Sequence, residues 1–373
     1  MIYLDNAATT HIKPYMVARA VAAWTRELSA NPGRGGHDLS INAGNKVYEC
    51  RELLARLFNI QRPENVIFTL NTTMALNIAI NGFIKPHSHV VISGMEHNSV
   101  YRPVVAKGCR FTIAKPDDTG LVTLESIKNA VNDNTDLIIL THASNVVGTI
   151  NPITQIGAFA KGKGITFLVD AAQTAGVMDI DVVRDNISML AFAGHKMLFG
   201  PMGTGGLYVA PGIELSPFIH GGTGSVSESA VQPDFLPDRF ESGTLNVPGI
   251  AGLTEGVKFI LKTTPKAIRE KETMLTTMLA ERLCNMEKLK IYGNQNRVGI
   301  VSFSIDGLDS VTVCNMLNEQ KIASRGGLHC APLAHQSLGT NGGLARLSTS
   351  FFNTKSDILH ATDAVYKIIK QHK

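Results

Sequence analysis

The stretches TFLVDAAQ (166–173) and SMLAFAGHK (188–196) decide the fold of this chain. Each begins as a short, almost wholly apolar segment and then reaches a charged residue, Asp170 in the first stretch and Lys196 in the second. Apolar runs of this length between polar turns are typical of strands buried on both faces of a sheet. Further strands are expected at 66–70, 90–93, 136–142 and 205–210, with helices at 74–84 and 153–162. Strands that alternate with helices predict an α/β fold with a mostly parallel sheet covered on both faces.

Beyond about residue 255 the order of the elements changes. We expect a helix at 264–287, strands at 289–293 and 299–305, a helix at 308–319, a strand at 345–350 and a final helix at 355–371. This order predicts a second, smaller α+β domain, and a length of 373 residues leaves room for one. Residues 220–248 are polar and rich in glycine, which indicates a functional loop rather than a linker.

The composition is that of a globular enzyme, with 44% hydrophobic residues, 18% charged residues and a net charge of +4. There is no lysine run or basic arm, so we expect no nucleic-acid partner. The N-terminal MIYLDNAATT lacks the basic start and the apolar core of a signal peptide. No apolar run approaches the ~18 residues that span a bilayer. We therefore expect a cytoplasmic protein with no membrane contact.

Five cysteines are present, and none belongs to a CxxC motif. Zinc-finger and thioredoxin-like sites are therefore not supported. Cys284 and Cys314 lie in apolar helical patterns, whereas Cys330 lies in a glycine-rich loop. His329 and His335 are close to Cys330 in the sequence, but no second ligand pair with a typical spacing accompanies them, so we expect no metal site.

Asp170 and Lys196 together suit a site for pyridoxal 5′-phosphate (PLP). PLP needs an amine that holds its aldehyde as a Schiff base. It also needs a carboxylate at its ring nitrogen, because a protonated ring withdraws electrons from the substrate. A lone buried carboxylate such as Asp170 is costly unless it is paired. The alternative for Lys196 is an ordinary surface lysine, and its apolar and glycine neighbours argue against that.

Other polar residues fall at or just after the expected strand ends. Thr72 and Thr73 precede a helix, and their hydroxyls with the first N–H groups of that helix suit a phosphate group. His97 and Asn145 follow later strands. Ligands of parallel sheets bind outside the carboxyl ends of the strands, so we expect these side chains to meet at one site. The alternatives are a plain helix cap, a structural core histidine and an ordinary turn asparagine.

Eight motifs, in order and spacing, resemble the cysteine desulfurases among the class V aminotransferase-like PLP enzymes. They are YLDNAATT (3–10), TLNTTMALN (69–77), MEHNS (95–99), SNVVGTINP (144–152), VDAAQ (169–173), GHK (194–196), RFESGTLN (239–246) and RGGLHCAPL (325–333). The RxGxHCA pattern is similar to the branch whose cysteine lies in a short, ordered loop, a branch shared with selenocysteine lyases. The resemblance implies PLP fold type I, with a seven-stranded sheet in a large domain at 15–255. A small α+β domain formed by 1–14 and 256–373 would carry the cysteine loop.

The resemblance also implies how PLP would be held. Lys196 corresponds to the Schiff-base lysine and Asp170 to the partner of the ring nitrogen. His97 corresponds to a histidine that stacks on the ring and exchanges protons with the substrate, and the flat ring and near-neutral pKa of histidine suit both tasks. The other implied cofactor contacts are Thr72, Thr73 and His195 for the phosphate, Gln173 and Asn145 for the phenolic oxygen, and Gly243 and Thr244 for the phosphate of the partner subunit in a homodimer.

One position departs from the family pattern. The family usually has a serine two residues before the histidine of GHK, whereas this chain has Ala193 two residues before His195. We therefore expect one phosphate hydrogen bond to be missing, so that PLP binds more weakly or another group compensates.

For the substrate, Arg346 corresponds to the arginine that binds the carboxylate, because a guanidinium offers a planar fork of donors. Arg325, His37 and Asn145 are further substrate-binding candidates, and Arg34 lies beside His37. Cys330 corresponds to the thiol that attacks the sulfur of the substrate as a thiolate.

The activity implied is conversion of L-cysteine to L-alanine, with a persulfide formed on Cys330 and passed to a sulfur-acceptor protein. A selenocysteine lyase acting on L-selenocysteine remains an open alternative. Another class V transaminase is a further alternative, and it would not need Cys330. A non-catalytic sulfur-handling scaffold is the alternative from a different class, and it would bind no PLP.

Overall fold

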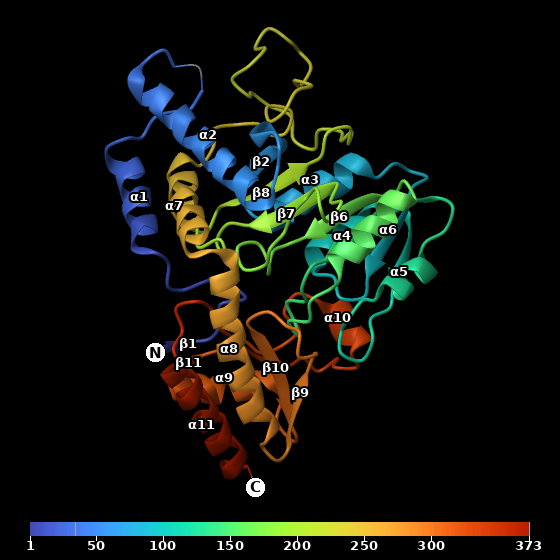
Figure 1. The fold of residues 1–373 in the computed structure, drawn as a ribbon, viewed down its shortest axis with the longest axis vertical. Helices are drawn as coiled ribbons and strands as arrows, with labels where there is room; N and C mark the ends of the chain where they lie inside the picture. The colour runs from blue at the N-terminus through green and yellow to red at the C-terminus, as the bar shows by residue number, and fades with distance from the viewer. Residues whose placement is uncertain (34, 373) are drawn as a thin grey trace.

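The computed structural model describes residues 1–33 and 35–372. Within these residues the central feature is a seven-stranded sheet (Figure 1). In order across the sheet its strands are β2 (Val66–Thr69), β8 (Gly205–Val209), β7 (Met189–Ala193), β6 (Thr166–Asp170), β5 (Thr135–Thr141), β3 (His89–Ser93) and β4 (Arg110–Ala114). Strands β7 to β4 run parallel, whereas β8 is antiparallel to both β7 and β2. The expected mostly parallel sheet is confirmed.

The central strands β7 and β6 are almost wholly apolar because the sheet is covered on both faces. Every residue of β2 and of β7 is buried. In a sheet with two covered faces no residue of a central strand meets water, so the sequence does not alternate between apolar and polar. The run MLAFA (189–193) is an example.

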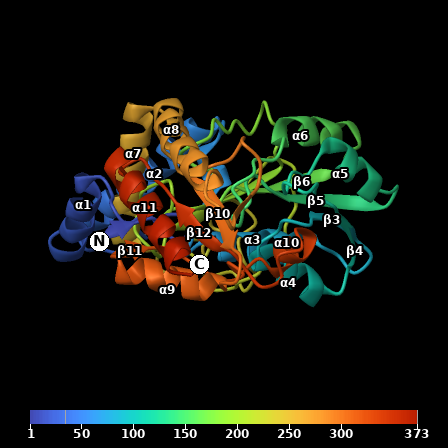
Figure 2. The same cartoon turned by 90° about the horizontal axis from the view of Figure 1, so that it is seen from below.

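Helices cover the two faces of this sheet (Figure 2). On one face lie α3 (Thr72–Phe83) and α4 (Asn98–Lys107), and on the other lie α5 (Leu124–Ala130) and α6 (Ile153–Gly162). Near β2 lie the short helix η1 (Pro63–Asn65) and three helices that pack together, α1 (Tyr15–Arg26), α2 (Asp38–Phe58) and α7 (Val247–Thr263).

Two helix caps bring polar groups to the carboxyl edge of the sheet. The side chain of Asn71 accepts a hydrogen bond from the Met74 N–H and so caps α3 directly after β2. The side chain of His97 caps α4 in the same way through the Ser99 N–H. Such caps satisfy N–H groups that the first turn of a helix leaves without partners.

The C-terminal part of the chain forms a second layer, in the lower half of Figure 1. Its three-stranded antiparallel sheet has the order β12 (Ala345–Ser348), β10 (Ile300–Ile305) and β9 (Leu289–Tyr292). Its helices are α8 (Pro265–Cys284), α9 (Ser310–Glu319), α10 (Pro332–Ser337) and α11 (Lys355–Gln371).

The N-terminus joins this second layer. Strand β1 (Ile2–Tyr3) pairs in parallel with β11 (Ile322–Ala323), and Leu4 lies in the same hydrophobic cluster as Leu347 and Ile358. The first residues of the chain therefore lie beside its last third.

Several elements were not expected from the sequence, namely β1, α1, α2, η1, α4, β4, α5, α7, β11 and α10. Helix α7 precedes the helix expected at 264–287, and Thr264, with φ 75°, separates α7 from α8. The expected domain boundary between residues 255 and 256 lies inside α7, and the two-domain division stays a prediction. None of the helices in the described part of the chain is long and apolar enough to cross a membrane.

Candidate functional site

One cavity at the carboxyl edge of the large sheet brings most of the expected residues together. Each lining residue follows β2, β3, β5, β6 or β7, or ends that strand. The lining consists of Asn71, Thr72, Thr73, His97, Ser99, Thr141, Asn145, Asp170, Ala172, Gln173, His195 and Lys196. Eight of the ten cofactor-binding candidates are in this set, including the five that the sequence places at strand ends. The edge of a parallel sheet is where such folds bind ligands.

Lys196 and Asp170 share this cavity and influence each other. Burial lowers the pKa of Lys196 to about 8, and the Asp170 carboxylate opposes that shift. Asp170 is 4% exposed and accepts a hydrogen bond from the Ala172 N–H at 2.9 Å. Burial raises the pKa of Asp170. A lysine with a lowered pKa has a larger fraction of neutral amine, the form that attacks a carbonyl, and the buried carboxylate needs a cationic partner.

His97 is held in one orientation by its own helix. Its Nδ1 accepts the Ser99 N–H at 3.1 Å and lies 2.7 Å from Ser99 Oγ. Burial and the nearby Lys196 lower the pKa of His97 to about 4, so the imidazole is neutral at physiological pH. Its side chain lines the cavity, and no hydrogen bond to the other ring nitrogen, Nε2, is made by a described residue.

The threonine and histidine expected at the phosphate end have polar atoms without partners. Thr72 Oγ1 and His195 Nδ1 are buried, and within residues 1–33 and 35–372 neither has a hydrogen-bond partner. Buried polar atoms are rarely left unsatisfied, so such atoms call for a ligand. Thr72 is the first residue of α3, where N–H groups and the helix dipole favour an anion, and His195 lines the same cavity from the end of β7. This donor set fits the phosphate of PLP.

Arg346 lies beside Asn145 and is held by Asp5. Its Nη1 donates to the Asn145 carbonyl oxygen at 2.7 Å and its Nη2 to Asp5 Oδ1 at 3.1 Å. Arg325 donates to the same carboxylate, with Nη2 2.8 Å from Asp5 Oδ2. Arg346 is 2% exposed, and its Nε is buried without a partner among the described residues. The sequence reasoning missed Asp5, although it lies in the YLDNAATT motif.

The loop with Cys330 is bonded directly to this site. The Asn98 N–H donates to the Cys330 carbonyl oxygen at 2.8 Å, and Asn145 Nδ2 donates to the His329 carbonyl oxygen at 2.7 Å. Because Asn98 follows His97, the first bond brings Cys330 next to the cavity. The Cys330 side chain is exposed. His329 and Cys330 have φ values of 51° and 56°, a region that costs about 1–3 kcal/mol for residues other than glycine.

The chain is similar in sequence to a known protein family over almost its whole length. The family model described as aminotransferase class-V matches residues 2–360. The chain belongs to this aminotransferase class-V family. A relative from Methanothermobacter thermautotrophicus, named "Probable cysteine desulfurase", is 35% identical, over 96% of this chain and 92% of the relative. The "Cysteine desulfurase" of Haloferax volcanii is 30% identical, over 98% of this chain and 88% of its own length.

Solved structures of cysteine desulfurases have the same fold. The apo cysteine desulfurase of Thermococcus onnurineus NA1 superposes with a TM-score of 0.94 at 31% identity, covering 99% of this chain and 95% of that one. A cysteine desulfurase of Escherichia coli gives 0.90 at 25% identity, with coverage of 99% and 95%. The resemblance drawn from the eight motifs is confirmed, and so is fold type I.

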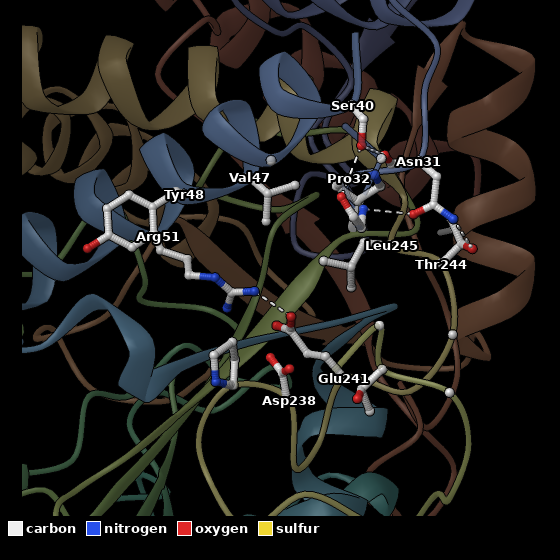
Figure 3. Close-up of a pocket in the computed structure, with 18 of the residues that line it drawn as sticks. Asn31, Pro32, Ser40, Val47, Tyr48, Arg51, Asp238, Glu241, Thr244 and Leu245 are labelled. Carbon is white, nitrogen blue, oxygen red and sulfur yellow. Dashed lines mark hydrogen bonds and ion pairs between the residues drawn. The ribbon is translucent and has the colours of Figure 1, made fainter. Parts of the chain in front are cut away.

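Three of the expected site residues line a second, separate cavity of about 520 Å³ (Figure 3). His37, Gly243 and Thr244 line it, and Lys196 does not. Asn31 Nδ2 donates to Thr244 Oγ1 at 3.4 Å, as Figure 3 shows. Arg34, the other candidate beside His37, lies outside the described residues. Within this chain these residues therefore do not meet the other site residues.

A buried ion pair supports the loop that carries Gly243 and Thr244. Arg51 and Glu241 form this pair, which lines the second cavity and is marked by a dashed line in Figure 3. Glu241 Oε1 also accepts the Phe68 N–H of β2 at 2.6 Å, and Arg51 donates to the Val66 carbonyl oxygen. The 220–248 loop is thus fastened to the strand that leads to Thr72.

Glu96 is a buried acid next to His97 that the sequence reasoning did not single out. It is 0% exposed, and its Oε1 accepts from Ser93 Oγ at 2.5 Å and from the Thr141 N–H at 2.8 Å. Its Oε2 is buried and has no partner in the described part of the chain. Burial, with Asp170 nearby, raises the pKa of Glu96 to about 8.

We expect Glu96 to make stability fall as pH rises. The folded state binds a proton that the unfolded state has already lost above about pH 5, so the free energy of unfolding decreases between about pH 5 and pH 8. Glu96→Gln keeps an acceptor for Ser93 and Thr141 but cannot ionise. The urea midpoint of this variant should depend less on pH than that of the wild type across this range. Equal slopes for the two proteins would show that Glu96 is ionised in both states.

Proposed function

We propose that this chain is a PLP-dependent cysteine desulfurase that converts L-cysteine to L-alanine and carries the sulfur transiently as a persulfide on Cys330. One observation carries the proposal. Lys196, Asp170 and His97 line a single cavity, and the Cys330 carbonyl oxygen accepts the N–H of Asn98, the residue after His97. The relatives named cysteine desulfurase support the same activity.

Bound PLP would supply an electron sink for the bond-making and bond-breaking steps at the substrate. Asp170 would pair with its ring nitrogen, and the Lys196 amine would hold it and move a proton at the α-carbon of the substrate. Thr72, Thr73 and His195 would bind its phosphate, and Gln173 and Asn145 would line its oxygen edge. His97, held neutral by burial, would lie against its ring.

Arg346 would bind the substrate carboxylate. Its Nε is a buried donor without a partner among the described residues, whereas its two terminal nitrogens are fixed by Asp5 and Asn145. A buried donor of this kind gains more from a carboxylate than an exposed one, because it has no competing water. Asp5, which Arg325 also binds, would keep the Arg346 guanidinium in place.

Cys330 would take the sulfur. Its thiolate attacks the sulfur of the bound L-cysteine, an S–S bond forms and the C–S bond breaks. The carbon that loses sulfur takes a proton, which gives L-alanine and a protonated persulfide with no oxidant or reductant consumed. A thiol on the acceptor protein then accepts the outer sulfur from Cys330.

We also propose a homodimer in which His37, Gly243 and Thr244 complete the site of the partner subunit. These residues line a cavity that does not contain Lys196 of their own chain. A second copy of the chain would therefore supply the missing contacts, Gly243 and Thr244 to the phosphate and His37 to the edge of the site. We propose in addition that the enzyme acts in the cytoplasm.

The test is a product assay on the PLP-loaded protein. With L-cysteine and a thiol reductant we expect equal amounts of alanine and sulfide, and the purified protein should show the visible absorbance of lysine-bound PLP. A keto acid in place of alanine would indicate a transaminase. A protein that binds no PLP when PLP is supplied would be a non-catalytic scaffold. L-Selenocysteine, assayed in parallel, separates a desulfurase from a selenocysteine lyase by the ratio of the two rates.

A further inference from the structure

Two buried histidines that flank Cys330 in the sequence have no part in the proposed reaction. His329 and His335 are 8% and 1% exposed. His329 Nδ1 lies 3.4 Å from His335 Nε2, while the ring centres are 5.6 Å apart and the ring planes meet at 18°. The distance between the two ring centres exceeds the distance between the two bonded nitrogens by about the width of one imidazole ring. The rings therefore lie end to end, as an N–H···N hydrogen bond requires, rather than face to face.

This pair belongs to a longer chain of hydrogen bonds. His335 Nδ1 lies 2.9 Å from Thr340 Oγ1 and 3.0 Å from the Thr340 carbonyl oxygen, and His329 Nε2 lies 3.3 Å from the Arg325 carbonyl oxygen. The pair of rings is therefore held by Thr340 at one end and by the backbone of Arg325 at the other. These end contacts fix both rings, whichever of the four ring nitrogens carry the protons.

Burial favours the neutral form of both histidines. The charged groups that face the pair are the guanidinium groups of Arg346 and Arg325, which disfavour a second positive charge. Burial, with Arg346 beside it, lowers the pKa of His329 to about 3, and burial also lowers the pKa of His335. The His329 ring is thus committed to His335 and Arg325 and stays uncharged at physiological pH.

The backbone at His329 and Cys330 needs support from both sides. Both residues have a positive φ, a conformation that residues other than glycine rarely adopt. On the cavity side Asn145 and Asn98 bond their carbonyl oxygens. On the opposite side the only link described for the His329 side chain is the histidine chain that ends at Thr340.

We propose that Thr340, His335 and His329 are positioning residues that hold the Cys330 loop in the orientation for sulfur transfer, and that they move no proton during the reaction. This inference rests on the proposed desulfurase function. It gives a role to the second histidine of RGGLHCAPLAH (325–335), a residue otherwise without one.

The test uses variants of the PLP-loaded enzyme that break the chain at separate links. Thr340→Val removes the hydroxyl that contacts His335 Nδ1 and keeps the shape of the side chain, and His335→Leu removes the ring that links Thr340 to His329. His335→Gln retains one acceptor and one donor. Thr277→Val, an exposed threonine on α8, is the matched control. Three readouts are needed: the absorbance change on adding L-cysteine, the rate of persulfide formation on Cys330 by mass spectrometry, and hydrogen exchange of residues 325–344.

We expect Thr340→Val and His335→Leu to slow persulfide formation by about tenfold or more, since a displacement of about 1 Å can cost up to ~100-fold. The L-cysteine concentration that gives half of the absorbance change should stay within about twofold of the wild type, because the cavity is intact. Residues 325–344 should exchange faster. His335→Gln should recover most of the rate, and the pH profile should keep its shape in every variant.

Three outcomes would overturn the proposal. Persulfide formation at the wild-type rate in both Thr340→Val and His335→Leu would show that the chain does not position Cys330. Equal loss of substrate binding would show a general structural role. A changed pH profile in these variants would show that the histidines transfer protons. Failure of the desulfurase function itself is distinguishable, because the wild-type enzyme would then form no persulfide.

Discussion

Lys196→Ala should abolish turnover and covalent retention of PLP together. The variant lacks the amine that would hold the cofactor and move a proton at the substrate, and loss of proton transfer alone costs about 10²–10⁴-fold. We expect alanine formation to fall by at least about 10³-fold. Borohydride reduces the Schiff base and so fixes a lysine-bound cofactor to the wild-type protein. After this treatment and gel filtration under denaturing conditions, PLP should stay with the wild type and separate from the variant.

The matched control for this variant is Lys163→Ala, which removes an exposed lysine at the end of α6. It should keep both the cofactor and the activity. If Lys196→Ala retained covalently bound PLP and full turnover, another lysine would hold the cofactor. The site assignment built on the cavity of Asp170 and His97 would then be wrong.

Cys330→Ala should separate cofactor chemistry from sulfur transfer. Asp170, Lys196 and Arg346 remain, so addition of L-cysteine should still change the absorbance of bound PLP. Release of sulfide should fall by about 10³-fold or more, because no thiolate remains to attack the sulfur. Mass spectrometry of the wild type after one turnover should find one added sulfur atom on the peptide that contains Cys330.

Cys284→Ala is the control, because Cys284 is the other exposed cysteine among the described residues. It should behave like the wild type. L-Selenocysteine distinguishes two enzymes of this fold: retained activity of Cys330→Ala on selenocysteine, with loss on cysteine, would show that only sulfur needs the thiol. Undiminished sulfide release from cysteine by Cys330→Ala would contradict the proposed persulfide.

The elements predicted most accurately are those whose apolar pattern lies within the element itself. Strand β6 at 166–170, helix α6 at 153–162 and helix α11 at 355–371 have the bounds expected. The expected helix at 74–84 starts two residues earlier, because the Asn71 side chain caps it. Helix α4 was missed because NSVYRPVVAK has a proline inside the helix and no strong apolar periodicity.

The candidate site followed from strand ends because the geometry of a parallel sheet fixes where those ends meet. Thr72, His97, Asn145, Asp170 and Lys196 line one cavity for that reason. Contacts that depend on distant segments could not be predicted in this way. Asp5 and Arg325 are 320 residues apart in the chain, and no local pattern joins them. The sequence also could not show that His37 lies away from Lys196 of the same chain.

The ion pairs of Asp5 with Arg325 and Arg346 join the two ends of the chain, and this has a consequence for biosynthesis. Asp5 leaves the ribosome early, whereas Arg325 and Arg346 leave it near the end of translation. A nascent chain that stops before these arginines keeps the carboxylate solvated, since burying it alone would cost several kcal/mol. The substrate end of the pocket is therefore assembled late, and premature termination yields a product without it.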